Sequence, residues 1–331
     1  MAVVMSVGMM STGVAAAVTD PSWAVQSTPN PSQSSGLLGV SCSSGTACTA
    51  VGSYVNSAAV SVTLAEHWNG TKWTVQSTPN PSGAQYSQLL GVSCSSGTAC
   101  TAVGSYENSS AVFVTLAEHW NGTKWTVQST PNPSGARYSE LEGVSCSSGT
   151  ACTAVGDYVN SAAVAVTLAE RWNGTKWTVQ STPNPSGAQF SVLVGVSCSS
   201  GTACTAVGAY DNSAAIGDYV KLAEHWNGTN WTIQSTPNPS GAQHSHLLGV
   251  SCSSGTACTA VGTYVNSAAV DVTLAEHWNG TNWTIQSTPN PSGAQGSLLQ
   301  GVSCSSGTAC TAVGGYENSS AGVVTLAERH S

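Results

Sequence analysis

The sequence predicts an all-β fold, a six-bladed β-propeller of four-stranded blades in which an N-terminal strand closes the ring against the C-terminal blade. Three observations predict it: a repeat of about 52 residues, four strand-like segments per repeat, and incomplete but complementary repeats at the two ends. No segment shows a sustained helical period of apolar residues, so we expect no helices in the core.

The repeat is nearly exact. One string, GVSCSSGTACTAVG, begins at Gly39, Gly91, Gly143, Gly195, Gly249 and Gly301. A second, W-[AT]-[VI]-Q-S-T-P-N-P-S, begins at Trp23, Trp73, Trp125, Trp177, Trp231 and Trp283. A third, L-A-E-[HR], begins at Leu64, Leu116, Leu168, Leu222, Leu274 and Leu326. Four-stranded units with a period in this range are typical of propeller blades.

Each repeat contains four short segments suited to strands, which we call a, b, c and d. In the second repeat they cover residues 89–94, 100–106, 114–120 and 124–130. They are rich in β-branched and aromatic residues and are bounded by Gly, Asn, Ser or Pro. Between c and d, the run from Trp120 to Trp125 contains Asn-Gly, which favours a tight hairpin. Pro131 and Pro133 then end strand d.

The two ends of the chain complement each other. A lone d segment begins at Trp23, and the last repeat stops after its c segment at Leu326–Arg329. We therefore expect the first to complete the blade begun by the last, within a single domain over residues 18–331. Residues 1–17 are predicted to be a signal peptide, because an apolar run precedes Ala15-Ala16-Ala17. The start lacks Lys and Arg, and a buried N-terminal strand is the alternative. No later stretch has the length of apolar sequence that a membrane span needs.

Twelve cysteines form six C-x5-C pairs, each flanking the turn between strands a and b. We predict a disulfide in every pair, because cross-strand neighbours are close and an exported protein retains such bonds. The pairs are Cys42/Cys48, Cys94/Cys100, Cys146/Cys152, Cys198/Cys204, Cys252/Cys258 and Cys304/Cys310. Metal binding is the alternative, but zinc sites favour shorter spacings, and six separate turns do not converge.

Composition excludes one class of partner. Only 7% of the residues are charged, the formal net charge is −8, and there are seven Lys and Arg in all. Nucleic-acid binding needs clustered basic residues, so it is not expected. The sequence also indicates no cofactor, and we expect a monomer.

Two residue types recur in the repeats with more than one interpretation. The paired tryptophans, as at Trp68 and Trp73, could be sugar-stacking platforms, but their repetition favours packing between blades with hydrogen-bonded N–H groups. A glutamate also recurs once per repeat. Paired carboxylates can catalyse glycoside hydrolysis, but only in unlike environments, so a structural role is favoured. These residues are Glu66, Glu118, Glu170, Glu224, Glu276 and Glu328.

The copies diverge where the chain approaches strand a. Every second position varies while Ser and Leu stay between them, so one side of an extended segment is free to change. We expect these side chains near the mouth of the central channel, on the face made by the d–a and b–c connections, and predict a ligand site there. Neutral drift at exposed positions is the alternative. The candidate residues are Tyr86, Gln88, Tyr138, Glu140, Phe190, His244 and His246.

Two of these candidates raise the question of a metal. His244 and His246 could hold one only with a third ligand from another blade, such as Glu140 or Glu142. Exposed or structural histidines are commoner, so no metal site and no catalytic residue is predicted.

The units GVSCSSGTACTAVGSY and LAEHWNGTKWTVQSTPNP resemble repeats of uncharacterised secreted bacterial β-propeller proteins. The resemblance spans Trp23 to Arg329 and implies a propeller fold and a secreted setting, but no activity. The W-N-G-x-x-W hairpin is also distantly similar to the Asp-box turn of sialidase-type propellers. His-Trp-Asn stands where that box has its Ser-x-Asp start.

Together these features predict a secreted, non-enzymatic binding or scaffold protein that recognises a glycan or a cell-surface protein. The alternative is a secreted sialidase-like glycoside hydrolase or lyase. That would need catalytic groups unique to single blades, such as an arginine cluster, and the chain has only Arg137, Arg171 and Arg329. A structural surface protein without a specific ligand is a third possibility.

Overall fold

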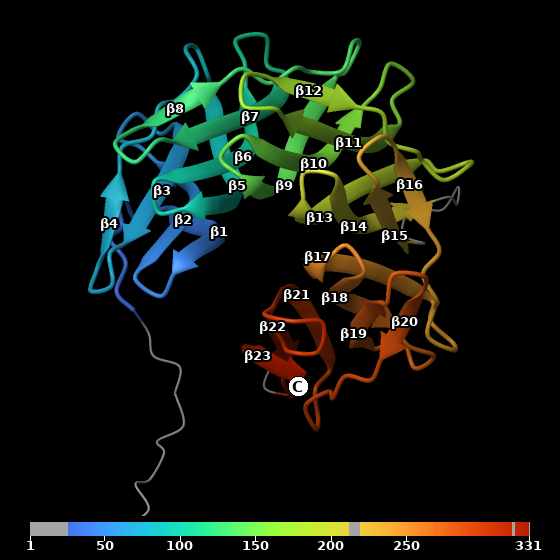
Figure 1. Cartoon of the computed structure of the whole chain (residues 1–331). Helices are drawn as coiled ribbons and strands as arrows, with labels where there is room; N and C mark the ends of the chain where they lie inside the picture. Colours follow the sequence, from blue (N-terminus) through green and yellow to red (C-terminus); the bar gives the residue numbers. More distant parts are fainter. Residues whose placement is uncertain (1–25, 212–218, 320–321, 331) are drawn as a thin grey trace, which may run out of the picture.

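The computed structural model describes residues 26–211, 219–319 and 322–330, and these form 23 strands and no helix. The strands are arranged as in a propeller, in successive antiparallel units around a central space (Figure 1). The predicted signal peptide and Trp23 lie outside the described residues. No helix long and apolar enough to span a membrane occurs in the described part of the chain.

Each repeat forms one antiparallel meander, and we call these meanders repeats 1 to 6. Their first strands lie nearest the central space (Figure 1): β1 (Ser35–Ser44), β5 (Tyr86–Ser96), β9 (Tyr138–Ser148), β13 (Phe190–Ser200), β17 (His244–Ser254) and β21 (Gly296–Cys304). Their second strands are β2 (Ala47–Val55), β6 (Ala99–Glu107), β10 (Ala151–Val159), β14 (Ala203–Asp211), β18 (Ala257–Val265) and β22 (Cys310–Glu317).

The third strands are β3 (Ser61–Trp68), β7 (Phe113–Trp120), β11 (Ala165–Trp172), β15 (Tyr219–Trp226), β19 (Asp271–Trp278) and β23 (Val323–His330). Short fourth strands lie outermost in repeats 1 to 5: β4 (Trp73–Gln76), β8 (Trp125–Gln128), β12 (Trp177–Gln180), β16 (Trp231–Gln234) and β20 (Trp283–Gln286). The strand segments expected from the sequence are confirmed, with the first strand longer and the fourth shorter than expected.

The hairpin between the third and fourth strands explains the repeated W-N-G-x-x-W motif. Trp120 pairs directly with Trp125, so the loop has four residues. Gly122 takes the left-handed conformation, with φ of +93°, which glycine adopts without strain. The Asn121 side chain accepts hydrogen bonds from the backbone N–H groups of Thr123 and Lys124, each at 3.0 Å. These bonds replace those of a regular turn and hold the two tryptophans opposite each other.

The predicted number of blades is wrong. The strands form five sheets, of which four have at least four strands: β1–β4, β5–β8, β9–β16 and β17–β20. Repeats 3 and 4 share the eight-stranded sheet, because β11 and β13 form a parallel bridge between Ala165 and Phe190. The sheet of repeat 6 has three strands, β21–β23. The structure therefore has four sheets with a full set of strands rather than six separate four-stranded blades.

The predicted closing strand begins at Trp23, outside the described residues. Residues 26–34 contain no strand, and β23 pairs only with β22. The outward residues at the two ends are exposed accordingly, with Val40 at 64% and Val323 at 79%. Gln26 nevertheless accepts a hydrogen bond from the Trp73 indole at 2.8 Å. The equivalent glutamine of each preceding fourth strand makes the same bond in later repeats, for example Gln76 with Trp125.

Successive repeats pack through a shared apolar interface rather than through separate cores. Val51 and Ala65 of repeat 1, for example, pack with Leu89, Leu116 and Trp125 of repeat 2. Equivalent clusters join the later repeats. Near the central space the backbones come closer still, since a Cβ on Gly91 would lie 2.9 Å from the Glu142 carbonyl oxygen. Glycine is therefore required by the spacing of the first strands at Gly39, Gly91, Gly143 and Gly249, whereas a Cβ on Gly301 would meet nothing closer than 3.6 Å.

All six predicted disulfides are present, and they connect directly opposed residues of the first and second strands. In repeat 2, Cys94 and Cys100 are cross-strand partners with a Cα–Cα distance of 4.0 Å. The backbone N–H of Cys94 also bonds to the Ser41 hydroxyl of repeat 1 at 2.9 Å. Each disulfide thus fixes a turn that also contacts its neighbour.

The two cysteines of each disulfide flank the turn as predicted, but they differ in burial. The first cysteine of each pair is exposed or half-buried, whereas the second is buried in the apolar core. Cys100, for example, packs in the cluster shared by repeats 1 and 2, and the Thr49 hydroxyl lies 3.6 Å from its sulfur. The buried second cysteines are Cys48, Cys100, Cys152, Cys204, Cys258 and Cys310. These six residues are therefore structural core residues and belong to no accessible site.

We expect the double substitution Cys94→Ser/Cys100→Ser to lower the free energy of unfolding by about 2 to 3 kcal/mol, because the unfolded chain regains loop entropy. Thermal melting of this variant and of the native protein measures the effect. The same melts in excess reductant are the control, since the native protein should then lose more stability than the variant does. Equal melting temperatures for variant and native protein without reductant would contradict the prediction.

Candidate functional site

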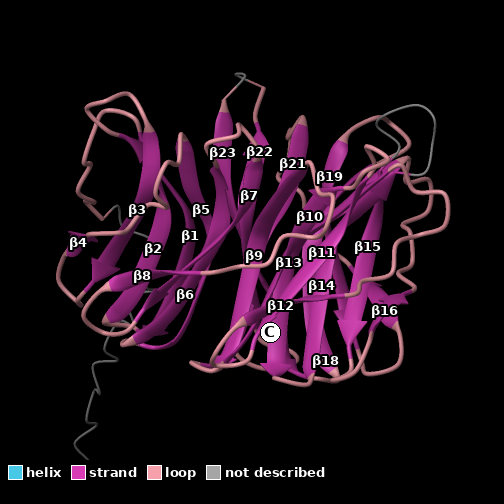
Figure 2. Ribbon diagram, turned by 90° about the horizontal axis from the view of Figure 1, so that it is seen from above, coloured by secondary structure: helices cyan, strands magenta, loops and turns pink. Residues whose placement is uncertain are grey.

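The predicted ligand residues lie at one end of the meanders, beside the central space. The backbone N–H of Gln85, in the connection to β5, bonds at 2.9 Å to the carbonyl of Glu107, where β6 ends. The d–a and b–c connections therefore share one end, as expected, while the hairpin turns lie at the other. Figure 2 shows the connections gathered at the two opposite ends of the upright strands.

Five residues of repeats 2 and 3 form what we call the central cluster: Tyr86, Gln88, Phe113, Tyr138 and Glu140. Gln88 donates to Glu140 Oε1 at 2.7 Å, across the interface between the repeats. Tyr86 donates to the Gln88 oxygen at 2.7 Å, and Tyr138 donates to Glu140 Oε2. The Glu140 side chain is only 7% exposed and also accepts from the Ser105 hydroxyl at 2.6 Å. Both carboxylate oxygens are thus held in position by neighbouring donors.

The aromatic part of the central cluster centres on Phe113, which the sequence analysis missed. Its ring centroid lies 5.6 Å from that of Tyr86 and 5.8 Å from that of Tyr138. Phe113 begins β7, where the six repeats carry Ser, Phe, Ala, Tyr, Asp and Val. Variation at this position was a signal of the same kind as variation before strand a. It was missed because the two segments are distant in sequence and meet only in the folded meander.

Two more carboxyl groups lie near Glu140. Burial, and then the nearby charge of Glu140, raise the pKa of Asp157 to about 7. Burial also raises the pKa of Glu142 to about 7, with further contributions from Glu140 and Asp157. Asp157 is directly opposite Glu140 in the pairing of β9 and β10. This part of the site is therefore acidic and suits groups that donate hydrogen bonds or carry positive charge.

The remaining candidates form a second cluster in repeats 4 and 5. Tyr219, at the start of β15, stacks between Phe190 and His246, with centroid distances of 5.8 and 4.8 Å. Burial lowers the pKa of His246, an effect that Asp271 opposes and His244 reinforces. In the described part of the chain, no group of three His, Cys, Asp or Glu side chains could hold a metal ion. The structure therefore does not bring Glu140 or Glu142 to the two histidines.

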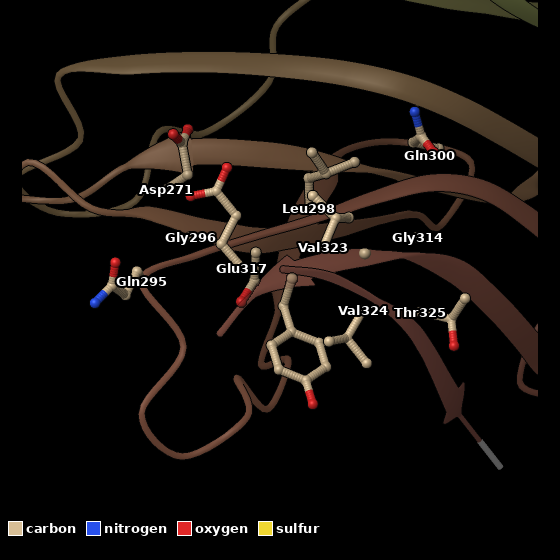
Figure 3. Close-up of a pocket in the computed structure, with 13 residues that line it drawn as sticks. Asp271, Gln295, Gly296, Leu298, Gln300, Gly314, Glu317, Val323, Val324 and Thr325 are labelled. Carbon is tan, nitrogen blue, oxygen red and sulfur yellow. The ribbon is translucent and has the colours of Figure 1, made fainter. Parts of the chain in front are cut away.

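Repeat 6 has a pocket in the corresponding place. Gly296 occupies the position of Tyr86 and Tyr138, and a pocket of about 420 Å³ opens beside it. In Figure 3, Asp271 and Glu317 lie at one end of this pocket and Gln300 at the other. Its walls come from all three strands of repeat 6, which has no neighbouring repeat on that side among the described residues. The pocket is thus part of the exposed end of the propeller.

Five of the six recurring glutamates are buried. Glu118, Glu170 and Glu224 are 0% exposed, and burial raises the pKa of each to about 8. A threonine hydroxyl of the preceding repeat partly offsets this, Thr63 in the case of Glu118. Glu276 differs, because Lys221 stands at the position of that threonine. Its Nζ forms an ion pair with Glu276 Oε1 at 3.3 Å. The equivalent burial of Glu118, Glu170 and Glu224 between repeats agrees with a structural role. Glu328, in the three-stranded sheet of repeat 6, is half-buried and lines a pocket.

The recurring tryptophans serve two purposes. In repeats 2 to 5 the second of each pair packs between repeats, as predicted: Trp125 is 3% exposed, and its indole donates to Gln76 at 2.8 Å. Trp73 of repeat 1 is only half-buried. The first of each pair stays partly exposed in most repeats, so packing does not account for it fully.

Comparison with known proteins shows a fold but no family. No protein-family model and no curated protein matches the chain. Among solved structures, the chain resembles a sialidase of Trypanosoma rangeli in complex with sialic acid, with 10% identity over 92% of this chain and a TM-score of 0.53. It spans only 57% of that sialidase. It also resembles a protein of unknown function from Dyadobacter fermentans, with 7% identity, a TM-score of 0.53, and coverage of 88% of this chain and 93% of the other. At such identities the likeness concerns the fold alone.

Proposed function

We propose that the chain is a secreted, non-enzymatic binding protein that recognises a hydroxyl-rich glycan at the central cluster. The observation that carries this proposal is the preorganised Glu140 carboxylate, which accepts from Tyr138 of its own strand and from Gln88 across the repeat interface. Buried, oriented carboxylates beside aromatic rings accept hydroxyl hydrogen bonds while a ring contacts the apolar face of a sugar. Disulfides are retained in oxidising compartments, which supports the extracellular setting.

The sialidase-like alternative has weaker support in the geometry. Sialic acid carries a carboxylate, and its recognition calls for arginine, but the central cluster is acidic. Arg137 donates to the Ser161 carbonyl at 3.1 Å on the surface, and Arg171 lies over the Trp226 ring. A tyrosine nucleophile needs a lowered pKa, whereas burial and the neighbouring Glu140 raise the pKa of Tyr138. We therefore expect no cleavage of a fluorogenic sialoside.

Glu140→Gln is expected to reduce glycan binding at least tenfold, because the amide cannot accept from both Gln88 and Tyr138 and offers a weaker acceptor to the ligand. A printed glycan array with neutral, amino and sialylated glycans identifies the ligand, and titration with the best glycan gives the affinity. Asp271→Asn is the matched control, a carboxyl-to-amide change at the start of β19 in repeat 5, outside the central cluster and its hydrogen-bond chain. We expect it to bind normally. Native-like binding by Glu140→Gln, or preference for sialylated glycans, would refute the proposed site.

A further inference from the structure

A second kind of pocket recurs between repeats, at the outer strands and far from the central cluster. Between repeats 1 and 2 it has a volume of about 370 Å³ and is lined by Gln76–Pro79 and by Trp120, Thr123, Lys124 and Trp125. Between repeats 2 and 3 the corresponding residues line a pocket of about 340 Å³. The two pockets are copies of one site, because every lining residue of one has its equivalent in the other 52 positions along the chain.

The two tryptophans in such a pocket differ in their surroundings. Trp125 is buried and donates its indole N–H to Gln76 Oε1, so the Gln76 oxygen is occupied and its amide nitrogen remains available to donate. Trp120 lies against Trp125, with centroids 5.9 Å apart, but is only partly buried. Part of the Trp120 indole is thus available to a ligand, beside the exposed Thr123 and Lys124.

One interface of the same chain has this tryptophan covered. Trp226, the equivalent of Trp120 in repeat 4, is 7% exposed, and the Arg171 guanidinium of repeat 3 lies 5.8 Å from its ring centroid. Histidine occupies the position of Arg171 in repeats 1 and 2, at His67 and His119. All three residues have a threonine of the fourth strand as their cross-strand partner. The protein itself therefore supplies an arginine that covers this site and a histidine that leaves it open.

We propose that these inter-repeat pockets, centred on Trp120 and Trp172, each bind one hexopyranose ring. A partly exposed indole suits the apolar face of such a ring, and the surrounding donors, Lys124 and the Gln76 amide, suit its oxygen atoms. The Thr123 hydroxyl donates to Asn121 at 2.8 Å, so its oxygen can accept from a sugar hydroxyl. The Arg171 guanidinium lies over the Trp226 ring, which shows that the face of this indole can be covered by a flat chemical group. Two equivalent sites on one chain would give the protein avidity for glycans that present several terminal sugars.

The indole N–H signals of the tryptophans in a ¹⁵N–¹H NMR spectrum test the proposal, with methyl glycosides of glucose, galactose, mannose and N-acetylglucosamine as probes. We expect at least one glycoside to shift the Trp120 and Trp172 signals saturably and to leave the Trp226 signal unchanged. Signals are assigned by single Trp→Phe variants. If none of the four probes moves Trp120 or Trp172, or if Trp226 responds equally, the proposal is wrong.

Two variants based on the chain's own alternatives sharpen the test. In His67→Arg/His119→Arg, the Trp120 and Trp172 signals should stop responding, because each ring is covered as Trp226 is. In Arg171→His, the Trp226 signal should begin to respond. Both changes reproduce arrangements already present at other interfaces, so the fold should tolerate them. Unchanged responses in both variants would overturn the proposal. Glu140→Gln should leave these shifts intact, which separates failure here from failure of the central site.

Discussion

The melting temperature of the protein is expected to fall by roughly 10 °C or more as the pH rises from 5 to 8.5, because buried carboxyl groups between repeats must then ionise. Glu118, Glu170 and Glu224 have their pKa raised by burial from 4.5 to about 8 in the folded state. Between these values the folded chain binds more protons than the unfolded chain. The contribution of these groups to the free energy of unfolding is therefore greatest below pH 4.5. It decreases as the pH rises to about 8, by at most about 1.4 kcal/mol per group and pH unit.

Thermal melts at several pH values measure this effect. The triple variant Glu118→Gln/Glu170→Gln/Glu224→Gln carries neutral side chains of nearly the same shape, so its melting temperature should depend much less on pH. Glu107→Gln, at the end of β6 and outside the interfaces, serves as the control and should keep the native dependence. A triple variant with the native pH profile would show that these glutamates do not control it.

Lys221→Met is expected to lower the free energy of unfolding by about 3 kcal/mol at pH 8.5, because it leaves the buried Glu276 without its charge partner. Both side chains of the pair are fully buried, with 3.3 Å between Lys221 Nζ and Glu276 Oε1. Lys221 also donates to Asn238 Oδ1 at 2.5 Å. Burial lowers the pKa of Lys221, and the interaction with Glu276 partly offsets this lowering. Burial raises the pKa of Glu276 to about 7, and the interaction with Lys221 partly offsets this increase. At pH 8.5 the loss of one partner therefore leaves an uncompensated charge.

The matched variant Lys221→Thr restores the residue that other repeats have at this position. In those repeats the threonine backbone N–H bonds to the asparagine that Lys221 now contacts, as Thr63 does with Asn80 at 3.1 Å. We expect Lys221→Thr to cost no more than about 1 kcal/mol, since the threonine hydroxyl can donate to Glu276 as Thr167 does to Glu224, whereas methionine has no donor. The deficit of Lys221→Met should also shrink at pH 5, where Glu276 is neutral. Equal losses for Met and Thr at pH 8.5 would show that the ion pair contributes little.

Much of the local structure could be predicted because it depends on nearby residues. The β-branched and aromatic segments, the Asn-Gly turns and the prolines after the fourth strand placed the strands to within a few residues. The C-x5-C spacing predicted all six disulfides, because the turn brings the two cysteines opposite each other. The side of strand a on which the copies diverge was also predicted, and Gln88 and Glu140 do meet there.

The errors concern contacts between distant segments. Six separate four-stranded blades were predicted by counting strand segments, but the sheets depend on which backbones approach, as Ala165 and Phe190 do. Phe113 and Asp157 were missed because their distances from Tyr138 and Glu140 along the chain carry no information about the packing of β7 and β10. Nor could the sequence distinguish the tryptophan buried in each pair from the one left partly exposed, or the buried cysteine of each disulfide from its more exposed partner.

The strands, turns and disulfides of this protein could be read from its amino-acid sequence, because they depend on residue types and on residues a few positions apart. The tertiary structure decided how many sheets form, which glutamates lose contact with water, and which divergent side chains share a site. Those properties depend on the spacing between repeats, where burial changes a carboxyl pKa and where side chains about 50 residues apart come within hydrogen-bond distance.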